Sequence, residues 1–306
     1  MDFLWLLSSI RNPVLDTIML AFSYIGTPFF IAGIIGWIYL NNDKKEAYGI
    51  SLSFILSCLL CQGVKVLARV PRPWNLDPTF KAVDASYSTA TGYSFPSVHT
   101  QSVTSVGLSC FYYNKKKPMR IISVALIVIV GFSRMYLGCH TPLDVGCAFL
   151  VTAVITAITW AIWNRHNRSF LDGNMLPFFV LAFSLALIFL VSALLINGTV
   201  DYANVKDSYE TSGAAIGFVV AFLVEPRFIC FSVEGSFKKK LIRFLIAVGG
   251  AVAIEFGLKA VFKDNIPMLV VRYALLTSWI MVLTPLISLR TGLAEKERAA
   301  QKLPQI

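Results

Sequence analysis

Long runs of apolar residues recur along the whole chain and are separated by short polar segments. Each run approaches the roughly 20 residues that an α-helix needs to cross a bilayer. The runs mix Leu, Ile, Val and Phe, whereas the strands of a membrane β-barrel alternate apolar and polar positions over about 10 residues. The pattern predicts an all-α, polytopic membrane helical bundle. We expect about nine transmembrane helices, at roughly 14–40, 47–68, 98–114, 119–137, 142–163, 176–196, 211–225, 241–262 and 267–289.

Three local features modify this pattern. Gly26, Thr27 and Pro28 interrupt the first run and predict a bend there. The apolar start of the chain lacks a basic region and a small-residue cleavage site, so we expect an interfacial helix rather than a cleavable signal peptide. The polar tail at 290–306 predicts a short surface helix or disorder. The seventh run is short and contains glycine, which makes it the weakest of the nine.

The basic residues predict how the helices are oriented. Of the 27 Lys and Arg residues, 17 fall in one set of segments, at 44–45, 115–120, 165–168, 227–243 and 290–302, and ten fall on the other side. Because cytoplasmic loops carry an excess of Lys and Arg, the first set is expected to be cytoplasmic. The N-terminus then lies outside and the C-terminus inside. The long loop 69–97 and the short loop 138–141 both face outward.

Composition narrows the function classes. Only 14% of the residues are charged, against about a quarter in a soluble domain. The net charge of +10 does not indicate nucleic acid, because the basic residues cluster in short loops between apolar runs. The six cysteines lie mostly in or at the ends of apolar runs, where free cysteine behaves as a small apolar packer. No disulfide framework and no redox motif is expected, although Cys58 and Cys61 have redox-type spacing.

Three polar motifs lie at the outward ends of predicted spans two to five. In the first, Lys65 ends a span and Arg72 follows seven residues later between Pro71 and Pro73. The prolines restrict the backbone and disfavour helix, so we expect Arg72 on a stiff turn. A guanidinium binds phosphate oxygens in a bidentate way, and an ammonium adds a point charge. Two interfacial cations that contact lipid head groups would give the same pattern.

The second motif is Pro96-Ser97-Val98-His99, directly before the third predicted span. Ser97 suits a helix N-cap, because its hydroxyl can accept a hydrogen bond from a free amide of the first turn. The unpaired N–H groups and the dipole of such a helix start favour an anion, and His99 lies in the same turn. An ordinary capped helix with an interfacial histidine is the alternative. The chain has only three histidines, and two of them, His99 and His140, lie in these motifs.

The third motif is a twelve-residue stretch that contains Arg134, His140 and Asp144. Thr141, Pro142 and Asp144 have the order of a helix start, with a capping hydroxyl, a proline at the first position and an acid at the third. Asp144 is therefore expected to cap the next helix. A carboxylate beside His140 can also orient the ring and stabilise the imidazolium. The two roles are compatible.

Together, the three motifs resemble the type-2 phosphatidic acid phosphatase superfamily, whose pattern is K-x6-R-P, then P-S-G-H, then S-R-x5-H-x3-D. Every spacing is present here, with Val98 in place of the usual glycine. Valine also supplies the backbone amide, although its β-branched side chain narrows the space. The sphingosine-phosphate phosphatase branch is similar in tolerating another residue at this position. The resemblance extends over about residues 11–165.

The resemblance implies hydrolysis of a lipid phosphate without a metal ion or other cofactor. His140 would attack phosphorus and form a phosphohistidine, Asp144 would orient His140, and His99 would protonate the leaving oxygen. The phosphoryl oxygens would be held by Lys65, Arg72, Ser97, Arg134 and the Val98 amide. Positive charge and fixed donors stabilise such a transition state, and histidine titrates near pH ~6.5, in the range for acid–base work.

Other activities fit the sequence less well. A cysteine phosphatase needs C-x5-R, and Val145 stands six residues after Cys139. A two-metal phosphatase needs more carboxylate and histidine ligands than the outward segments offer. Related haloperoxidases bind vanadate with the same histidine and arginine set, but they are soluble. A lipid transporter or a non-catalytic scaffold with a phosphate-binding site is the alternative of a different class, because nine spans exceed the six usual for the family.

Residues 1–170 are expected to form the catalytic membrane core, and residues 171–306 a four-span region with a short cytoplasmic tail. We expect a multi-pass protein of the cell membrane whose site faces outside, or the lumen if the membrane is internal. Aromatic residues that suit the interface surround the site: Trp74, Tyr87, Tyr93 and Phe95. Membrane lipids are the expected partners. Polyprenyl diphosphate, phosphatidate and a sphingoid phosphate all fit as substrates, and the sequence predicts neither a choice among them nor an oligomeric state.

The C-terminal spans contain ionisable residues at membrane depth. Glu255 and Lys259 are four residues apart, so they share one helix face, and Arg272 lies in the next span. Such residues are costly in a bilayer and usually face a partner or a wet cavity. We expect an internal ion pair that holds spans eight and nine together. A second polar site, for a lipid head group or a subunit contact, is the alternative.

Overall fold

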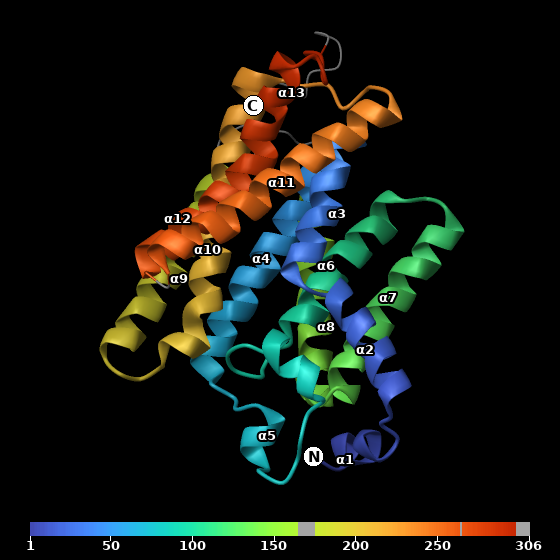
Figure 1. The fold of residues 1–306 in the computed structure, drawn as a ribbon, viewed down its shortest axis with the longest axis vertical. Helices are drawn as coiled ribbons and strands as arrows, with labels where there is room; N and C mark the ends of the chain where they lie inside the picture. The colour runs from blue at the N-terminus through green and yellow to red at the C-terminus, as the bar shows by residue number, and fades with distance from the viewer. Residues whose placement is uncertain (165–174, 264, 298–306) are drawn as a thin grey trace. The chain divides into compact units, whose positions relative to one another are not determined.

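The computed structural model describes residues 1–164, 175–263 and 265–297, and these residues are helical apart from loops and one isolated β-bridge (Figure 1). Seven of the described helices are long and apolar enough to cross a membrane. The count rises to eight if the bent pair α2 (Pro13–Ile25) and α3 (Pro28–Asn41) forms one span. The prediction of an all-α polytopic protein is confirmed at this level. Its orientation in the membrane stays a prediction.

The described helices follow the apolar runs closely, with α1 at Asp2–Ser9, α4 at Lys44–Ala68, α5 at Pro73–Leu76, α6 at Val98–Tyr113, α7 at Lys117–Tyr136, α8 at Pro142–Asn164, α9 at Met175–Ile196, α10 at Tyr202–Val224, α11 at Phe237–Phe262, α12 at Ile266–Ser278 and α13 at Thr284–Arg290. A 3₁₀ segment occupies Asp84–Thr89, and π-helical turns follow α10 and α12, at Glu225–Ile229 and Trp279–Leu283.

The predicted count of nine spans is not confirmed among the described residues, because one expected span forms a short helix and another forms a bent pair of helices. The run at 98–114 forms α6, which has 16 residues and is therefore only about 24 Å long, shorter than the roughly 30 Å hydrocarbon core. The run at 14–40 is divided into α2 and α3, which meet at an angle of 50°. The expected bend at Gly26 is thereby confirmed. A Cβ added to Gly26 would lie 2.9 Å from Val130 Cγ1 and 3.0 Å from the carbonyl oxygen of His99, so glycine permits a close approach there.

The first compact unit of the chain consists of Met1–Ala32, Leu56–Ala161 and Ala193–Asp207. Within it α7 packs against α1, α2 and α6. Val103, Ile127 and Val130 form a buried cluster where α6 meets α7. All three polar motifs fall inside this unit, so its helices position the candidate site.

The second unit consists of Gly33–Ile55, Ile162–Ser192 and Ser208–Ile306. In it, α10 and α12 pack closely at Gly213 and Gly217, where an added Cβ would lie 2.4 Å from the carbonyl oxygens of Val270 and Ala274, respectively. Small residues four positions apart allow this kind of close contact between membrane helices. α10 has 23 residues and begins nine residues before the run predicted at 211–225, because its first turns are polar.

A buried ion cluster joins three segments of the second unit. Lys44 Nζ lies 3.0 Å from Glu225 Oε1 and 2.7 Å from Glu297 Oε1, and it donates a hydrogen bond of 2.8 Å to the carbonyl oxygen of Phe231. An isolated antiparallel bridge pairs Phe231 with Lys296. The described start of the polar tail, at 291–297, thus consists of turns followed by this bridge and forms no helix. The rest of the tail, at 298–306, lies outside the described residues.

The ion pair expected between spans eight and nine is present with a different basic partner. Glu255 Oε2 of α11 lies 3.2 Å from Arg272 Nε of α12, whereas Lys259 is exposed. Because breaking a largely buried pair leaves an uncompensated charge, we expect Glu255→Gln to lower the free energy of unfolding by on the order of 2–3 kcal/mol. Thermal unfolding in detergent checks this, with Lys259→Gln as the matched control. Equal losses in the two variants would contradict the assignment.

Candidate active site

The position of Arg72 in the candidate site is fixed at both its backbone and its guanidinium. It has an extended conformation, with φ −68° and ψ 154°, and Pro73 directly after it begins the short helix α5. The expected stiff turn is therefore present. Its second proline, Pro73, starts a helix instead of preventing one, because proline is favoured at the first helical position. The ring of Trp74 lies 5.9 Å from the guanidinium carbon.

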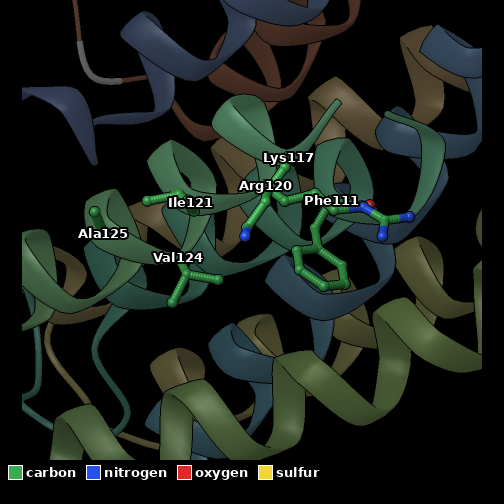
Figure 2. A pocket seen from close by; sticks show the side chains of 6 residues that line it. All are labelled: Phe111, Lys117, Arg120, Ile121, Val124 and Ala125. Atoms are coloured by element: carbon green, nitrogen blue, oxygen red, sulfur yellow. The ribbon is translucent and has the colours of Figure 1, made fainter. Parts of the chain in front are cut away.

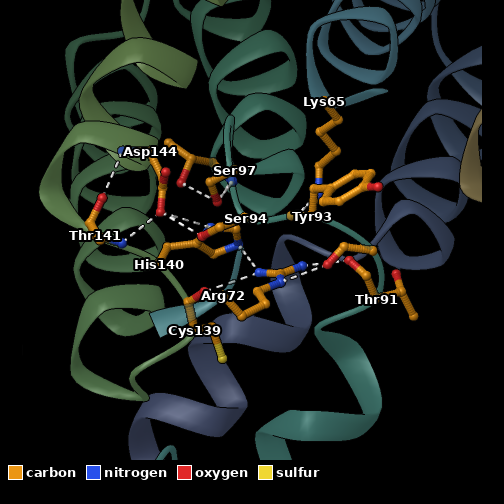
Figure 3. Close-up of polar contacts among 12 residues, drawn as sticks. Lys65, Arg72, Thr91, Tyr93, Ser94, Ser97, Cys139, His140, Thr141 and Asp144 are labelled. Atoms are coloured by element: carbon orange, nitrogen blue, oxygen red, sulfur yellow. Dashed lines mark hydrogen bonds and ion pairs between the residues drawn. The ribbon is translucent and has the colours of Figure 1, made fainter. Parts of the chain in front are cut away.

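Main-chain carbonyls surround the Arg72 guanidinium, which is almost completely buried. Nε donates to the carbonyl oxygen of Gly92 at 3.0 Å, and Nη1 to that of Cys139 at 3.0 Å. Nη2 donates to the carbonyl oxygen of Thr91 at 2.5 Å (Figure 3). These neutral acceptors orient the guanidinium without neutralising its charge.

The ring of His140 is held between Arg72 and Asp144 (Figure 3). Its Nε2 lies 2.9 Å from Arg72 Nη1, and its Nδ1 lies 3.6 Å from Asp144 Oδ2. A guanidinium can only donate hydrogen bonds, so Nε2 is the accepting nitrogen and carries the lone pair. The proton of the neutral ring is then on Nδ1, on the side of the carboxylate. This tautomer leaves Nε2 available as a nucleophile.

Asp144 has both of the roles that its position predicted. Its Oδ2 accepts a hydrogen bond of 2.7 Å from the amide of Thr141, and its own amide donates to Thr141 Oγ1 at 3.3 Å, which is a reciprocal cap of α8. The same Oδ2 accepts from Ser94 Oγ at 2.7 Å and faces His140. The carboxylate is buried, with 2% of its surface exposed. These fixed donors set its position relative to the histidine ring.

The start of α6 brings the second motif to the same place. The amide of Ser97 donates to the carbonyl oxygen of Asp144 at 3.1 Å, which links the second motif to the third. Ser97 Oγ caps α6 by accepting from the amide of Thr100 at 3.4 Å, as predicted, and Val98 is the first residue of the helix. His99 interacts electrostatically with His140. Its Nε2 is buried and has no hydrogen-bond partner among the described residues.

Two further buried cations complete the cluster. Arg134, in the last turn of α7, is 0% exposed and donates from Nη1 to Ser23 Oγ at 2.7 Å and to Thr89 Oγ1 at 3.3 Å. Within the described part of the chain, its Nε and Nη2 are buried without a partner. Lys65, in the last turn of α4, donates from Nζ to the carbonyl oxygen of Tyr93 at 2.6 Å.

The cluster has an excess of positive charge. Three buried cations, Lys65, Arg72 and Arg134, accompany the single buried carboxylate of Asp144. Burial, followed by the charges of the three cations, lowers the pKa of His140 well below its usual value of 6.5. Burying more cations than counter-charges is unfavourable, so the cluster is suited to bind an anion. No group of three or more His, Cys, Asp or Glu side chains that could hold a metal ion occurs among the described residues.

The sequence predicted that the motif residues lie together, but it did not predict which groups form hydrogen bonds with them. Ser94, which donates to Asp144, lies only two residues before Pro96, yet nothing in the sequence distinguishes it from other loop serines. Ser23 and Thr89 reach Arg134 from α2 and from the 3₁₀ segment. The carbonyls that bind Arg72 belong to the backbone, and residue types do not reveal them.

An apolar pocket of about 490 Å³ lies at the opposite ends of α6 and α7 (Figure 2). It is lined by Phe111, Lys117, Arg120, Ile121, Val124 and Ala125. The motif residues are at the start of α6 and the end of α7, so the pocket is separate from the candidate active site. Arg120 donates to the carbonyl oxygens of Phe111 and Asn114, at 3.1 Å and 2.8 Å, and thereby closes the turn between the two helices.

Comparison with known proteins finds relatives that match part of this chain. An undecaprenyl-diphosphatase of Sulfolobus acidocaldarius is 29% identical over 120 residues, which cover 39% of this chain and 56% of that protein. Sphingosine-1-phosphate phosphatase 1 of Mus musculus is 29% identical over 140 residues, which cover 44% of this chain and 31% of that protein. The matches therefore span about half and about a third of these relatives. The crystal structure of Aquifex aeolicus LpxE matches 52% of this chain and 93% of its own, with 21% identity and a TM-score of 0.47.

Two family models match, and together they cover about two thirds of the chain. The model of the PAP2 superfamily matches residues 47–168, a range that includes all three motifs. The model described as "PAP2 superfamily phosphatase, transmembrane extension" matches residues 209–296. PAP2 is the type-2 phosphatidic acid phosphatase superfamily that the motifs resemble. By its motifs, by their assembly into one buried cluster and by both matches, this chain belongs to the PAP2 superfamily.

Proposed function

We propose that this protein is a membrane phosphatase that hydrolyses a lipid phosphate or diphosphate by a metal-free mechanism. One observation carries the proposal: His140 presents Nε2 to the arginine that would bind the phosphate, and Nδ1 to the carboxylate of Asp144. A neutral imidazole held in this tautomer, next to a fixed guanidinium, is equipped to attack phosphorus. The named activities of the relatives support the same reaction class.

In the first step, the lone pair of His140 Nε2 forms a bond to phosphorus and the bond to the lipid oxygen breaks. His99, whose protonated form is favoured by the negative charge of the bound phosphate, gives its proton to that oxygen, so the lipid leaves as an alcohol, or as a monophosphate if the substrate is a diphosphate. In the second step, His99 removes a proton from water, the water oxygen attacks phosphorus, the bond between phosphorus and His140 Nε2 breaks, and inorganic phosphate leaves. Asp144 stabilises the positive ring of His140 in both steps.

The cations act on the phosphoryl group during both steps. Lys65, Arg72 and Arg134 compensate the negative charge that spreads over its oxygens, and Ser97 and the Val98 amide supply further donors at the start of α6. The positions of Arg72 and Arg134 are fixed by acceptors of the protein before substrate binds. Such fixed charges need little reorganisation in the transition state.

The site would open to the outer leaflet, so that a lipid phosphate reaches it by lateral diffusion. The substrate class is tested by phosphate release from a panel of polyprenyl diphosphate, phosphatidate and a sphingoid phosphate, using purified protein in detergent. Release from at least one of them, lost in His140→Ala, supports the proposal. Transport or binding of lipid phosphates without any release would favour the alternative, a transporter or a non-catalytic scaffold.

Chelation is expected to leave the reaction intact. The three buried cations already supply the positive charge that a metal ion would otherwise bring to the phosphate. Phosphate release should therefore remain unchanged, within about a factor of two, after dialysis against EDTA. Loss of activity in EDTA that Mg²⁺ or Zn²⁺ restores would contradict the metal-free mechanism.

The acid limit of activity is expected to depend on the charge of Arg72. Attack requires neutral His140, whose pKa is held well below 6.5 by burial and then by Arg72. Protonation should therefore stop attack only well below pH ~6.5. Arg72→Gln removes a positive charge, raises the pKa of His140, and should shift the acid limb of kcat/KM to higher pH. Because substrate ionisation is the same for both proteins, an unshifted limb would argue against His140 as the titrating group.

A further inference from the structure

We propose that Asp207, in the first turns of α10, is a positioning residue of the site, because it holds the loop whose carbonyls orient Arg72 and Lys65. The inference rests on the proposed function and deepens it. Asp207 lies outside the three motifs and outside the family matches at 47–168 and 209–296. It belongs to the same compact unit as the catalytic cluster.

Three consecutive loop residues supply carbonyl oxygens to the cations of the site. The carbonyls of Thr91 and Gly92 accept from Arg72, and the carbonyl of Tyr93 accepts from Lys65. The loop has no helix or strand bonds of its own at these positions. Contacts with other segments must therefore fix where the three carbonyls point, and with them the two cations (Figure 3).

α10 makes two contacts with this loop. Thr91 Oγ1 donates to Asp207 Oδ2 at 2.5 Å. Gly92 has φ +62°, and a Cβ added to it would lie 2.9 Å from the main-chain oxygen of Asn204. Asn204 and Asp207 are three residues apart and so share one face of the helix. The hydrogen bond and the close approach together fix the loop against α10.

The negative charge of Asp207 also helps to hold Lys65 and Arg72 in place. Its carboxylate is partly buried and interacts electrostatically with both Lys65 and Arg72. It therefore attracts the two cations while it also accepts the hydrogen bond from Thr91. Without it, the loop and the guanidinium that the loop orients are free to shift away from His140.

The test compares Asp207→Ala, Thr91→Val and the double variant, with Asn204→Ala as the matched control. The control lies on the same helix face and keeps the main-chain carbonyl that approaches Gly92. Two quantities are measured: kcat/KM for the best substrate of the panel, and the inhibition constant of orthovanadate, which mimics the five-coordinate phosphoryl group. Each single variant should lower kcat/KM and weaken vanadate inhibition about tenfold, as expected for the loss of one charge-assisted hydrogen bond.

The double variant should be no worse than Asp207→Ala alone, because Asp207→Ala already removes the hydrogen bond that Thr91→Val removes. Asp207→Asn, which keeps an acceptor oxygen, should recover part of the loss. A role in stability alone would reduce the melting temperature and the active fraction but leave the inhibition constant of vanadate unchanged, and that result would overturn the proposal. Additive losses would also overturn it. His140→Ala in the same assay separates this inference from the proposed function. If His140→Ala is inactive and Asp207→Ala keeps the kcat/KM and the vanadate inhibition constant of the wild type, only this inference fails. Turnover by His140→Ala contradicts the proposed function.

Discussion

His140→Ala is expected to lower turnover of a lipid phosphate by about 10⁴-fold or more, as removal of a nucleophile does in other enzymes that form a covalent intermediate. The alanine removes Nε2. No other described side chain contacts Arg72 with a ring nitrogen whose partner nitrogen faces a carboxylate. The fold should persist, because the cap of α8 is made by Thr141 and Asp144. Phosphate release and thermal unfolding are the two measurements.

The matched control for this variant is His166→Ala, since His166 is the one histidine that none of the three motifs includes. It should keep the turnover of the wild type. If His140→Ala retained more than about a hundredth of wild-type turnover, in contrast to typical nucleophile variants, the assignment of the nucleophile would be wrong.

Asp144→Asn is expected to lower kcat by roughly 10³–10⁴-fold, as the same change does beside another catalytic histidine. Asp144 Oδ2 faces His140 Nδ1 and also accepts from Ser94 and from the Thr141 amide, so the amide oxygen takes this place in the variant. The neutral amide then no longer stabilises the positive ring that His140 carries once Nε2 has attacked phosphorus. The amide oxygen can still accept from Ser94 and from the Thr141 amide, so the helix cap should lose only about 1 kcal/mol or less.

The measurements are kcat and the melting temperature, compared with Asp84→Asn, which changes an exposed acid at the start of the 3₁₀ segment. Asp84→Asn should leave both quantities as they are in the wild type. A large loss of melting temperature in Asp144→Asn with a kcat near normal would show that the carboxylate is only a helix cap.

Much of the site could be predicted because its chemistry is encoded locally. The distance from His140 to Asp144 is one helical turn, and the Thr141–Pro142 start fixes where that turn begins, so the capping box places the carboxylate beside the ring. Ser97 likewise caps α6 where the sequence placed a cap. These features follow from short-range geometry, which spacing alone can reveal.

The parts that could not be predicted depend on segments distant in the sequence. Ser23 and Arg134 are hydrogen-bonded although they are 111 positions apart in the sequence, and Asp207 and Thr91 are hydrogen-bonded across 116 positions. No periodicity or spacing encodes such pairs. The early start of α10 was not predicted for a related reason, since hydropathy records apolar character and not where helical hydrogen bonds begin.

Covalent labelling during the first turnover tests the central claim, that His140 is the nucleophile, most directly. Enzyme mixed with lipid phosphate carrying labelled phosphorus is quenched within the first turnover in alkaline detergent, because a phosphorus–nitrogen bond to histidine survives base and is cleaved by acid. Peptide mapping should place close to one labelled phosphate per active enzyme on the peptide that contains His140, and none in His140→Ala. Label on another residue, or no label at any time during a turnover that His140→Ala also completes, would contradict the account.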